Sequence, residues 1–504
     1  MRLTQNEGVV QSLSVMAQPL AAIILAAGLG TRMRSDRAKV LHELAGEPML
    51  ARVLRAVATL NPHPLVVVVG HQAERVRGAA QGAVGHAELR FALQSDQRGT
   101  GDAARCAVTE LPATFAGDVL IGYGDMPRID PHTLRAFIDD HHARGTDLSF
   151  ISVELEDPAA YGRVVRDSAG AVAAIVEARD ATPAQLALKE INTGIYLVGA
   201  ALLRTALAQL RNDNAQREFY LTDIVAIART HGRRVFAWRA RDDAEFAGIN
   251  SREDLARMET QIREEVNRRL MAAGVTFIDP ATACIAPEVE IGRDTIIGPN
   301  VQILGRTRIG AGVVVEGTAW LRDVTIGDRC HLKICVRAED CVIGEESEIG
   351  PFANLRAGTE LEGHNRIGNF VETKKARLGR GTKASHLSYL GDTVIGRETN
   401  VGCGVITVNY DGYDKHVTQI GDRCMVGCDT QLIAPIKVGD DVYVASGTTI
   451  VRDVEDGALV MSHHPQREKA GWTANWHQRH AGHPKAVANA HTRSRGDSGN
   501  GAPG

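Results

Sequence analysis

Three features are scarce or missing in this sequence: an excess of basic residues, long apolar runs and closely paired cysteines. The 57 Lys and Arg residues are outnumbered by 61 Asp and Glu, and the net charge of −4 gives no reason to expect a nucleic acid or a membrane as partner. No apolar run approaches the roughly 20 residues of a membrane span, and the start lacks the basic cluster and apolar core of a signal peptide. The eight cysteines include no C-x-x-C pair, so we expect free thiols in a cytoplasmic protein.

The sequence changes character along its length, which indicates separate domains. Residues 20–250 alternate short apolar runs with amphipathic helical patterns, an order typical of an α/β domain with a mostly parallel sheet. In residues 251–274 apolar side chains recur at helical spacing after a capping pair, Ser251 and Asp254. This segment is predicted to form a linker helix.

Residues 275–463 follow a different rule, because aliphatic residues return at every sixth position and glycine often follows them. Such hexapeptide repeats build a parallel β-helix with about 18 residues per coil. The phase of the repeat slips at 322–342 and at 373–419, where we expect loops to protrude. The repeat positions are Ile285, Ile291, Ile297, Ile303, Ile309, Val315 and Leu321, then Ile343, Ile349, Leu355, Leu361 and Ile367, then Ile420, Val426, Leu432, Val438, Val444 and Ile450.

The two ends of the chain differ from both domains. Residues 1–19 are expected to form a disordered leader. Residues 464–504 hold little aliphatic content and cannot bury a core, so we expect a disordered tail. The histidines in and next to the tail are irregularly spaced, which favours a solvated segment over a metal site.

The segment IILAAGLGTRM, residues 23–33, joins an apolar run to a glycine loop that carries an arginine. A dinucleotide-binding fingerprint would need a third glycine where Met33 stands, and the lysine motif of a P-loop is absent. The residues alone therefore predict backbone N–H groups at a strand-to-helix turn that bind an anion, in preference to a tight turn without a ligand.

The loop and the repeats together resemble one family. Residues 25–33 are similar to the L-A-A-G-x-G-T-R-M signature of nucleotidyltransferases that join a sugar 1-phosphate to a nucleoside triphosphate. With the hexapeptide repeats behind this loop, residues 20–460 resemble the bacterial bifunctional UDP-N-acetylglucosamine pyrophosphorylases/glucosamine-1-phosphate N-acetyltransferases. The resemblance implies a Rossmann-like nucleotidyltransferase domain followed by a left-handed β-helix, in a homotrimer whose subunits share the coenzyme groove.

For the first domain the resemblance implies uridylyl transfer from UTP to N-acetylglucosamine 1-phosphate. Charge grows on the departing pyrophosphate, and Arg32 and Lys39 would neutralise it. Asp125 and Asn250 match the family's Mg²⁺ ligands. The positions that match nucleotide contacts are Leu25, Ala26, Ala27, Gly28, Arg32, Lys39, Gln94, Gly99, Thr100, Tyr123, Gly124, Asp125 and Asn250, and those that match sugar contacts are Gly162, Glu177 and Asn192.

For the second domain the resemblance implies acetyl transfer from acetyl-CoA to glucosamine 1-phosphate. An amine that attacks a thioester must lose a proton, and His386 would accept it as the general base. Glu372 would help to orient the amine. The sugar-phosphate positions are Arg356, Lys374, Tyr389, Asn400 and Lys415, and the acetyl-CoA positions are Cys403, Asn409, Tyr410, Cys428, Ser446 and His463.

Four of the coenzyme positions depart from the family pattern. Cys403 lies in a segment where G-A-G-T-I-T is usual, Cys428 stands where serine is common, Ser446 where alanine is common, and His463 where arginine is common. These departures concern coenzyme affinity, because the base and sugar positions are kept.

We therefore expect one chain to make UDP-N-acetylglucosamine for cell-envelope polysaccharides, with UTP, acetyl-CoA and the two sugar phosphates as substrates and with neither nucleic acid nor membrane as partner. Two alternatives remain open. One is a pyrophosphorylase whose β-helix serves mainly for trimerisation, and the other is a pyrophosphorylase whose second domain uses another sugar or acyl group.

Overall fold

The computed structural model describes residues 18–85, 88–462 and 466–483. Their contacts divide the chain into two units, the first ending at Asp340 and the second starting at Cys341. Nearly all of the predicted leader, 1–19, lies outside the described residues. Within the described ranges no helix combines the length and the apolar character that a membrane crossing requires.

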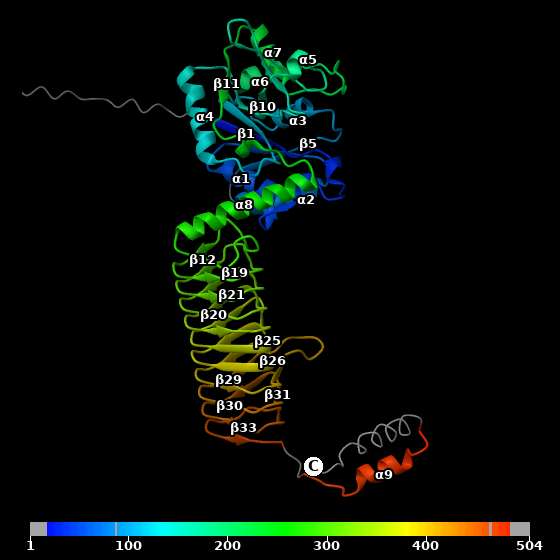
Figure 1. Ribbon diagram of the computed structural model, residues 1–504, viewed down its shortest axis with the longest axis vertical. Helices are drawn as coiled ribbons and strands as arrows, with labels where there is room; N and C mark the ends of the chain where they lie inside the picture. Colours follow the sequence, from blue (N-terminus) through cyan, green and yellow to red (C-terminus); the bar gives the residue numbers. More distant parts are fainter. Residues whose placement is uncertain (1–17, 86–87, 463–465, 484–504) are drawn as a thin grey trace, which may run out of the picture. The chain divides into compact units, whose positions relative to one another are not determined.

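The first unit contains a nine-stranded sheet made of short apolar segments (Figure 1). Its strands are β1 Leu20–Leu25, β4 Leu65–Val69, β5 Leu89–Leu93, β6 Asp118–Tyr123, β7 Leu148–Glu154, β8 Arg163–Arg166, β9 Val172–Val176, β10 Glu190–Gly199 and β11 Val235–Arg239, beside a small hairpin of β2 Glu43–Leu44 and β3 Glu47–Pro48. The order is β11-β7-β10-β6-β1-β4-β5, with β8 and β9 off this path. β1 is parallel to β4 and β6, whereas β10 is antiparallel to its neighbours. The predicted α/β class is confirmed.

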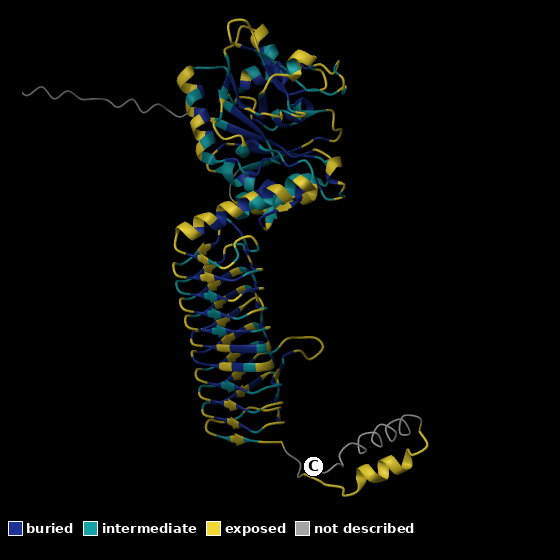
Figure 2. Ribbon diagram, in the orientation of Figure 1, coloured by how far each residue is buried: buried dark blue, intermediate teal, exposed yellow. Residues whose placement is uncertain are grey.

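Helices cover both faces of this sheet, which explains why its strands are apolar throughout. The helical segments are η1 Thr31–Met33, η2 Lys39–Leu41, α1 Met49–Ala58, α2 Ala73–Val84, α3 Thr100–Val108, α4 Pro131–Arg144, α5 Pro183–Leu186, α6 Ala200–Gln209, α7 Asp223–Thr230 and η3 Ala244–Phe246. Alternate side chains of β1 point to opposite faces. Ile23 packs in a core with α3, α6 and α7, and Ile24 packs in a second core with α1, α2 and α4. Figure 2 shows the sheet as buried.

The long helix α8, Arg252–Ala272, begins at the predicted capping pair. Ser251 Oγ accepts the N–H of Asp254 at 3.1 Å, and the Asp254 carboxylate accepts the N–H of Ser251 at 2.9 Å. Near the other end of the helix, Asn267 Nδ2 donates to the carbonyl of Ala283 at 3.0 Å. α8 is thereby fixed to the first coil of the repeats.

Short parallel strands carry the repeats, as predicted. They are β12 Thr276–Phe277, β13 Cys284–Ile285, β14 Glu290–Ile291, β15 Ile296–Ile297, β16 Gln302–Leu304, β17 Arg308–Ile309, β18 Val314–Val315, β19 Trp320–Ile326, β20 His331–Leu332, β21 Arg337–Ile343, β22 Glu348–Ile349, β23 Asn354–Leu355, β24 Thr359–Leu361, β25 Arg366–Leu378, β26 Lys383–Ile395, β27 Asn400–Val401, β28 Ile406–Val408, β29 Thr418–Ile420, β30 Met425–Val426, β31 Gln431–Ile433, β32 Ile436–Val438, β33 Tyr443–Val444, β34 Thr449–Ile450 and β35 Leu459–Val460. Ile285 pairs with Ile303, its counterpart three repeats later in the next coil, and both are buried.

The loop predicted at 322–342 is wrong. A coil of regular length would pair Arg308 with Ile326, but Arg308 pairs with Thr325. The coil has therefore been shortened instead of gaining a loop. A corner can absorb this deletion because the strands on either side keep their inward-facing residues.

In 373–419 the prediction of a protruding loop holds at one place. Lys383 pairs with Asn400, where a regular coil would give Val401, so the first coil of this segment is again merely short. Thr393, however, pairs with Thr418, well beyond Asp411, which a regular coil would give. The additional residues form the loop that protrudes from the coils to the right of the label β26 in Figure 1.

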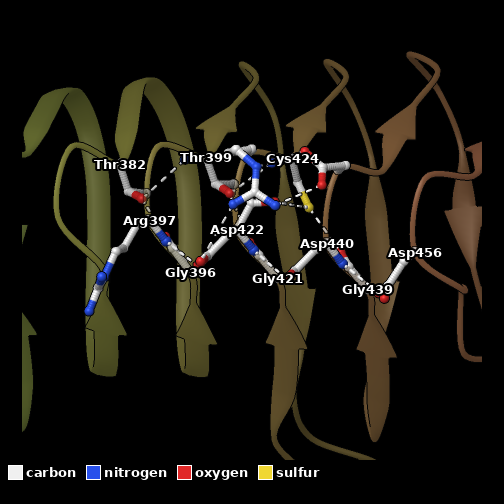
Figure 3. A network of polar contacts seen from close by, with 12 residues as sticks. Thr382, Gly396, Arg397, Thr399, Gly421, Asp422, Cys424, Gly439, Asp440 and Asp456 are labelled. Atoms are coloured by element: carbon white, nitrogen blue, oxygen red, sulfur yellow. Dashed lines mark hydrogen bonds and ion pairs between the residues drawn. The ribbon is translucent and has the colours of Figure 1, made fainter.

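A ladder of aspartates explains why glycine ends many repeats in the second unit (Figure 3). In successive coils a carboxylate accepts the backbone N–H of the residue that follows the glycine of the coil before. The bonds run from Arg397 to Asp422 at 2.7 Å, from Asp422 to Asp440 at 2.8 Å and from Asp440 to Asp456 at 2.8 Å. A Cβ on Gly421 would press against the Asp440 carboxylate, so the repeat needs glycine there.

Asp440→Ala is expected to loosen the ladder locally, because the N–H of Asp422 loses its acceptor. The net worth of such a bond, about 0.5–1.5 kcal/mol, corresponds to roughly 2- to 12-fold in the local opening equilibrium. Hydrogen exchange of the peptide that contains Asp422 measures it. Asp440→Asn keeps an oxygen acceptor and is the control; equal exchange in the two variants would contradict the role of the carboxylate.

Part of the predicted tail, 464–504, contains a helix whose residues are all exposed. The helix α9, Trp472–Arg479, lies in its described part, where Trp472 and Trp476 stack with ring centroids 5.3 Å apart. Aromatic side chains four residues apart stabilise a helix, and the overall composition of the tail does not reveal this pair. Residues 464, 465 and 484–504 lie outside the described residues.

Candidate active sites

The glycine loop and the predicted acidic residue come together at one edge of the sheet. Leu25 and Tyr123 are paired at the carboxyl ends of the parallel strands β1 and β6, and Gly124 N–H donates to the Leu25 carbonyl at 3.0 Å. Ligands of open α/β sheets bind at this edge. Gly30 has φ of +61° and a Cβ there would press against Lys39, so the loop needs glycine at this position.

Four predicted polar residues from distant parts of the chain meet beside the loop. Lys39 Nζ contacts the Asp125 carboxylate and lies 3.1 Å from Asn250 Oδ1. Arg32 Nη2 donates to the same oxygen of Asn250 at 2.9 Å. The N–H of Ile249 donates to the Asp125 carbonyl at 3.0 Å, which ties the two acceptors to each other.

Asp125 and Asn250 offer oxygen atoms suited to a hard divalent cation. A carboxylate and an amide oxygen are ligands that Mg²⁺ accepts, with water and phosphate oxygens in the remaining positions. The Lys39 ammonium contacts the Asp125 carboxylate and Asn250 Oδ1, so these two oxygens already bind a positively charged group. The donor set fits such an ion.

A cavity of about 500 Å³ opens beside this cluster and is lined by the glycine loop, Gln94, Gly99, Thr100 and Tyr123. Gln94 is buried, and its Nε2 donates to the Gly99 carbonyl at 3.1 Å and to Asp102 Oδ2 at 3.0 Å. Both amide hydrogens are thus used inside the protein. The Oε1 atom is left as an acceptor, with the amide oriented by this network.

The three predicted sugar positions lie together next to Tyr123. Asn192 N–H donates to the Gly162 carbonyl at 2.9 Å, and a Cβ on Gly162 would lie 3.6 Å from the Glu177 carboxylate. Burial raises the pKa of Glu177 against the opposing hydrogen bond from Thr222 Oγ1, which is 3.1 Å long. Burial, with a further contribution from Glu177, also raises the pKa of Tyr123.

Three further polar residues around this site were not predicted from the sequence. Asp102 fixes the Gln94 amide, and Thr222 fixes the Glu177 carboxylate. Asp223 follows Thr222, and burial together with the charges of Asp213 and Asp180 raises its pKa to about 6. The available signal was weak: each is one polar residue in the first turn, or at the N-cap, of a helix.

Four of the five predicted sugar-phosphate residues of the second unit lie on or against β25 and β26: Arg356, Lys374, Tyr389 and Lys415. Glu372 pairs with Tyr389 across these strands, and Asn369 pairs with His386. Arg356 Nη1 donates to Glu372 Oε1 at 2.8 Å, and this hydrogen bond raises the pKa of the arginine further. An arginine, a carboxylate and a phenol therefore lie on one face of the coils.

Two lysines meet beside them. The contact with Lys374 lowers the pKa of Lys415, first by a hydrogen bond and then by charge repulsion. Two ammonium groups this close favour a bound anion. Lys415 forms an isolated β-bridge with Tyr410 in the protruding loop. Asn409 Nδ2 donates to Asp392 Oδ2 at 2.5 Å. Two of the predicted coenzyme residues, Asn409 and Tyr410, therefore lie at the base of that loop.

His386 begins a column of predicted residues. The register pairs Lys383 with Asn400, Asn400 with Met425, and Met425 with Tyr443. Three residues after each of these positions stand His386, Cys403, Cys428 and Ser446. His386, Cys428 and Ser446 are exposed and Cys403 is half-buried. The predicted sugar-phosphate residue Asn400 lies on β27, the strand that follows β26, with its Nδ2 3.2 Å from Met425 Sδ. His463 lies outside the described residues.

Known families match three parts of the chain. Residues 22–223 match the MobA-like NTP transferase domain, residues 280–361 the GMPPB C-terminal domain, and residues 418–452 the bacterial transferase hexapeptide (six repeats).

Curated relatives match almost the whole chain. Bifunctional protein GlmU of Pelobacter propionicus is 48% identical over 453 residues, covering 90% of this chain and 98% of the relative. GlmU of Mycolicibacterium vanbaalenii is 46% identical over 454 residues (90% and 92% covered), and that of Geotalea uraniireducens is 45% identical over 453 residues (90% and 98% covered). The similarity runs through both groups of residues described above.

Proposed function

This chain belongs to the family of bifunctional GlmU proteins, and from that premise we propose how its residues divide two reactions. The chain is a UDP-N-acetylglucosamine diphosphorylase and a glucosamine-1-phosphate N-acetyltransferase. The observation that carries this conclusion is similarity at 48% identity over 90% of the chain, through the sheet and the repeats alike. A pyrophosphorylase whose β-helix serves only for trimerisation does not account for this similarity to bifunctional proteins across both domains.

We assign uridylyl transfer to residues 20–250. The glycine loop would hold the triphosphate with backbone N–H groups, and Arg32 and Lys39 would neutralise the charge that develops on the departing pyrophosphate. No side chain acts as a nucleophile, because an oxygen of the sugar phosphate attacks the α-phosphorus directly. The bond between the α-phosphorus and the oxygen that bridges to the β-phosphate breaks, and pyrophosphate leaves.

A divalent metal accompanies this reaction in the family, and we propose Mg²⁺ held by Asp125 and Asn250. When bound, the ion would supply further neutralisation of the phosphate oxygens. The residues of the chain orient its ligands: Lys39 contacts both of them, and Asp254 Oδ2 accepts the N–H of Asn250 at 3.1 Å.

Gln94 supports uracil as the base. Its Nε2 hydrogens are bound to Gly99 and Asp102, so only Oε1 can meet the base edge. Uracil carries a hydrogen on N3 and cytosine does not, and a buried acceptor left without a donor costs about 1–3 kcal/mol. This preference for uracil over cytosine supports UTP, the nucleotide that the family implies.

We assign acetyl transfer to residues 275–463, with His386 as the general base. Arg356, Lys374 and Lys415 would bind the sugar phosphate, and Glu372 would orient the amine. The amine nitrogen attacks the thioester carbonyl and His386 takes the amine proton; the carbon–sulfur bond then breaks, and the His386 imidazolium returns the proton to the departing sulfur, so that CoA leaves as the thiol. We propose a homotrimer, the assembly of hexapeptide transferases, in which a neighbouring subunit completes the coenzyme groove beside the exposed His386.

The experiment that tests this assignment is thiol release from acetyl-CoA. Glucosamine 1-phosphate should release CoA thiol, whereas N-acetylglucosamine 1-phosphate, whose nitrogen is already acylated, should not. Release with another amino sugar phosphate or another acyl-CoA in preference to this pair would assign a different substrate to the β-helix. Because all substrates are metabolites of the cytoplasm, we place the enzyme there.

Alkylation of Cys428 is expected to inactivate acetyl transfer before uridylyl transfer. The thiol is exposed and stands in the column below His386, whereas Cys403 is half-buried. Acetyl-CoA should protect, because it would cover the same column, and UTP should not. Brief iodoacetamide labelling with peptide mapping measures this, and Cys428→Ser is the matched control. Inactivation that persists in the serine variant, or an unmodified Cys428 after labelling, would contradict the prediction that alkylation of Cys428 blocks acetyl transfer.

A further inference from the structure

The sheet edge opposite the nucleotide cavity carries a second cluster of polar side chains. β6 begins at Asp118 and leads at its other end to Asp125, and the extended chain between them separates the two carboxylates by about 20 Å. His141 and His142 lie at the end of α4. One potential ligand atom from each of Asp118, His141 and His142 falls within 4.8 Å of the others. None of the three belongs to the sites described above.

The end of α4 directs both histidines towards this edge. The helix stops at Gly145, which has φ of +58°. His142 lies at the rim with Nε2 2.7 Å from Asp118 Oδ2, while His141 is only 3% exposed. A cavity of about 1180 Å³ opens beside them. An ion could therefore reach side chains that are themselves held in place.

Charges around the cavity favour a cation slightly. Arg135 and Arg234 line it, and so do Asp139 and Asp147. Arg234 forms an ion pair with Asp147 at 3.7 Å. The two arginines and the two aspartates cancel in charge, and Asp118 adds one negative charge.

Two hydroxyls contact Nδ1 of His141, Ser149 Oγ at 2.8 Å and Thr146 Oγ1 at 3.0 Å, which leaves Nε2 as the nitrogen that can bind a metal. We assign Nδ1–H as donor to Ser149 Oγ at 2.8 Å, the Ser149 hydroxyl as donor to Thr146 Oγ1 at 2.8 Å, and the Thr146 hydroxyl as donor to the His141 carbonyl at 3.2 Å. This closed ring uses every hydroxyl hydrogen and leaves the lone pair on Nε2. Among the residues that the structure describes, Nε2 has no hydrogen-bond partner.

Metal-binding histidines usually have their second ring nitrogen held by a hydrogen-bond partner, and Ser149 Oγ holds Nδ1 of His141 in this way.

We propose that Asp118, His141 and His142 bind a divalent transition-metal ion of the Zn²⁺ type. Two imidazole nitrogens and one carboxylate oxygen form a three-ligand set that leaves a fourth position open for water. Imidazole selects Zn²⁺, Co²⁺ or Ni²⁺ over Mg²⁺ and Ca²⁺, which prefer oxygen ligands alone. Ser149 is a positioning residue, because it acts through His141.

The test is a Co²⁺ titration of the full chain with saturating Mg²⁺, followed by visible absorption of the bound ion. Wild type should bind one more equivalent than His142→Gln and Asp118→Asn, whose side chains keep the hydrogen bond between positions 118 and 142 but lose a ligand. His132→Gln, on the exposed first turn of the same helix, should bind as wild type does. Ser149→Ala should weaken binding by about 10–100-fold without changing the shape of the spectrum.

All variants keep the histidines of 464–504, so metal bound there cancels in the comparison. Circular dichroism shows that each variant is folded. Co²⁺ binding that is equal in wild type and His142→Gln, or that is absent from wild type, overturns the proposal. Zn²⁺ should displace the Co²⁺ spectrum, and displacement by Ca²⁺ alone would also contradict the assignment. Neither result would alter the two transfer activities assigned above.

Discussion

Asp125→Ala is expected to lower UTP-dependent pyrophosphate release by at least about 10²–10³-fold, the loss typical of removing one preorganised electrostatic group. Asp125 follows β6 at the edge of the sheet, where its carboxylate contacts Lys39 and lies beside Asn250. Without it the proposed Mg²⁺ loses a ligand, and the Lys39 ammonium loses the partner that positions it near the leaving pyrophosphate.

Acetyl transfer by the same variant serves as the internal control, because its residues lie in the other unit. Asp139→Ala removes an equal charge from an exposed position of α4 and should leave pyrophosphate release near the wild-type rate. Near-normal uridylyl transfer by Asp125→Ala would show that this carboxylate is not a metal ligand.

His386→Ala should lower kcat of acetyl transfer by roughly 10²–10⁴-fold, the usual loss when a general base is removed. KM for glucosamine 1-phosphate should change little, because Arg356, Lys374 and Lys415 are untouched. Steady-state kinetics of thiol release measures both constants.

His364→Ala is the matched control, since this histidine is exposed on another face of the coils and pairs with Glu346 at 3.2 Å. Uridylyl transfer should be normal in both variants. A His386→Ala enzyme that binds sugar phosphate poorly but turns over at the normal rate would make His386 a binding residue and leave the general base unassigned.

Periodic features were predictable from the sequence. A period of six residues forces one aliphatic side chain per repeat into the coil, and Ile285 and Ile303 accordingly pair and are buried. Capping of α8 by Ser251 and Asp254 was predictable for a similar reason, because both bonds are local.

Non-local features were harder to predict. A slip in the repeat looks the same in sequence whether a coil is shortened, as before Thr325, or gains a loop, as before Thr418. Asp102 and Thr222 support Gln94 and Glu177 through single hydrogen bonds that no motif encodes.

The candidate sites were predictable only as ordered sets of residues. Lys39 and Asn250 are separated by 211 positions, and only the fold shows that they touch. The column of Cys403, Cys428 and Ser446 below His386 likewise depends on coils of unequal length, which the sequence period alone does not give.

The central claim is that one chain performs both transfers, and an incubation with acetyl-CoA labelled in the acetyl group, glucosamine 1-phosphate, UTP and Mg²⁺ tests it most directly. Wild type should place the label in UDP-N-acetylglucosamine, Asp125→Ala should stop with label in N-acetylglucosamine 1-phosphate, and His386→Ala should leave nearly all of it in acetyl-CoA. Label that stays in acetyl-CoA with wild type, while the same preparation makes UDP-N-acetylglucosamine from added N-acetylglucosamine 1-phosphate, would contradict the account.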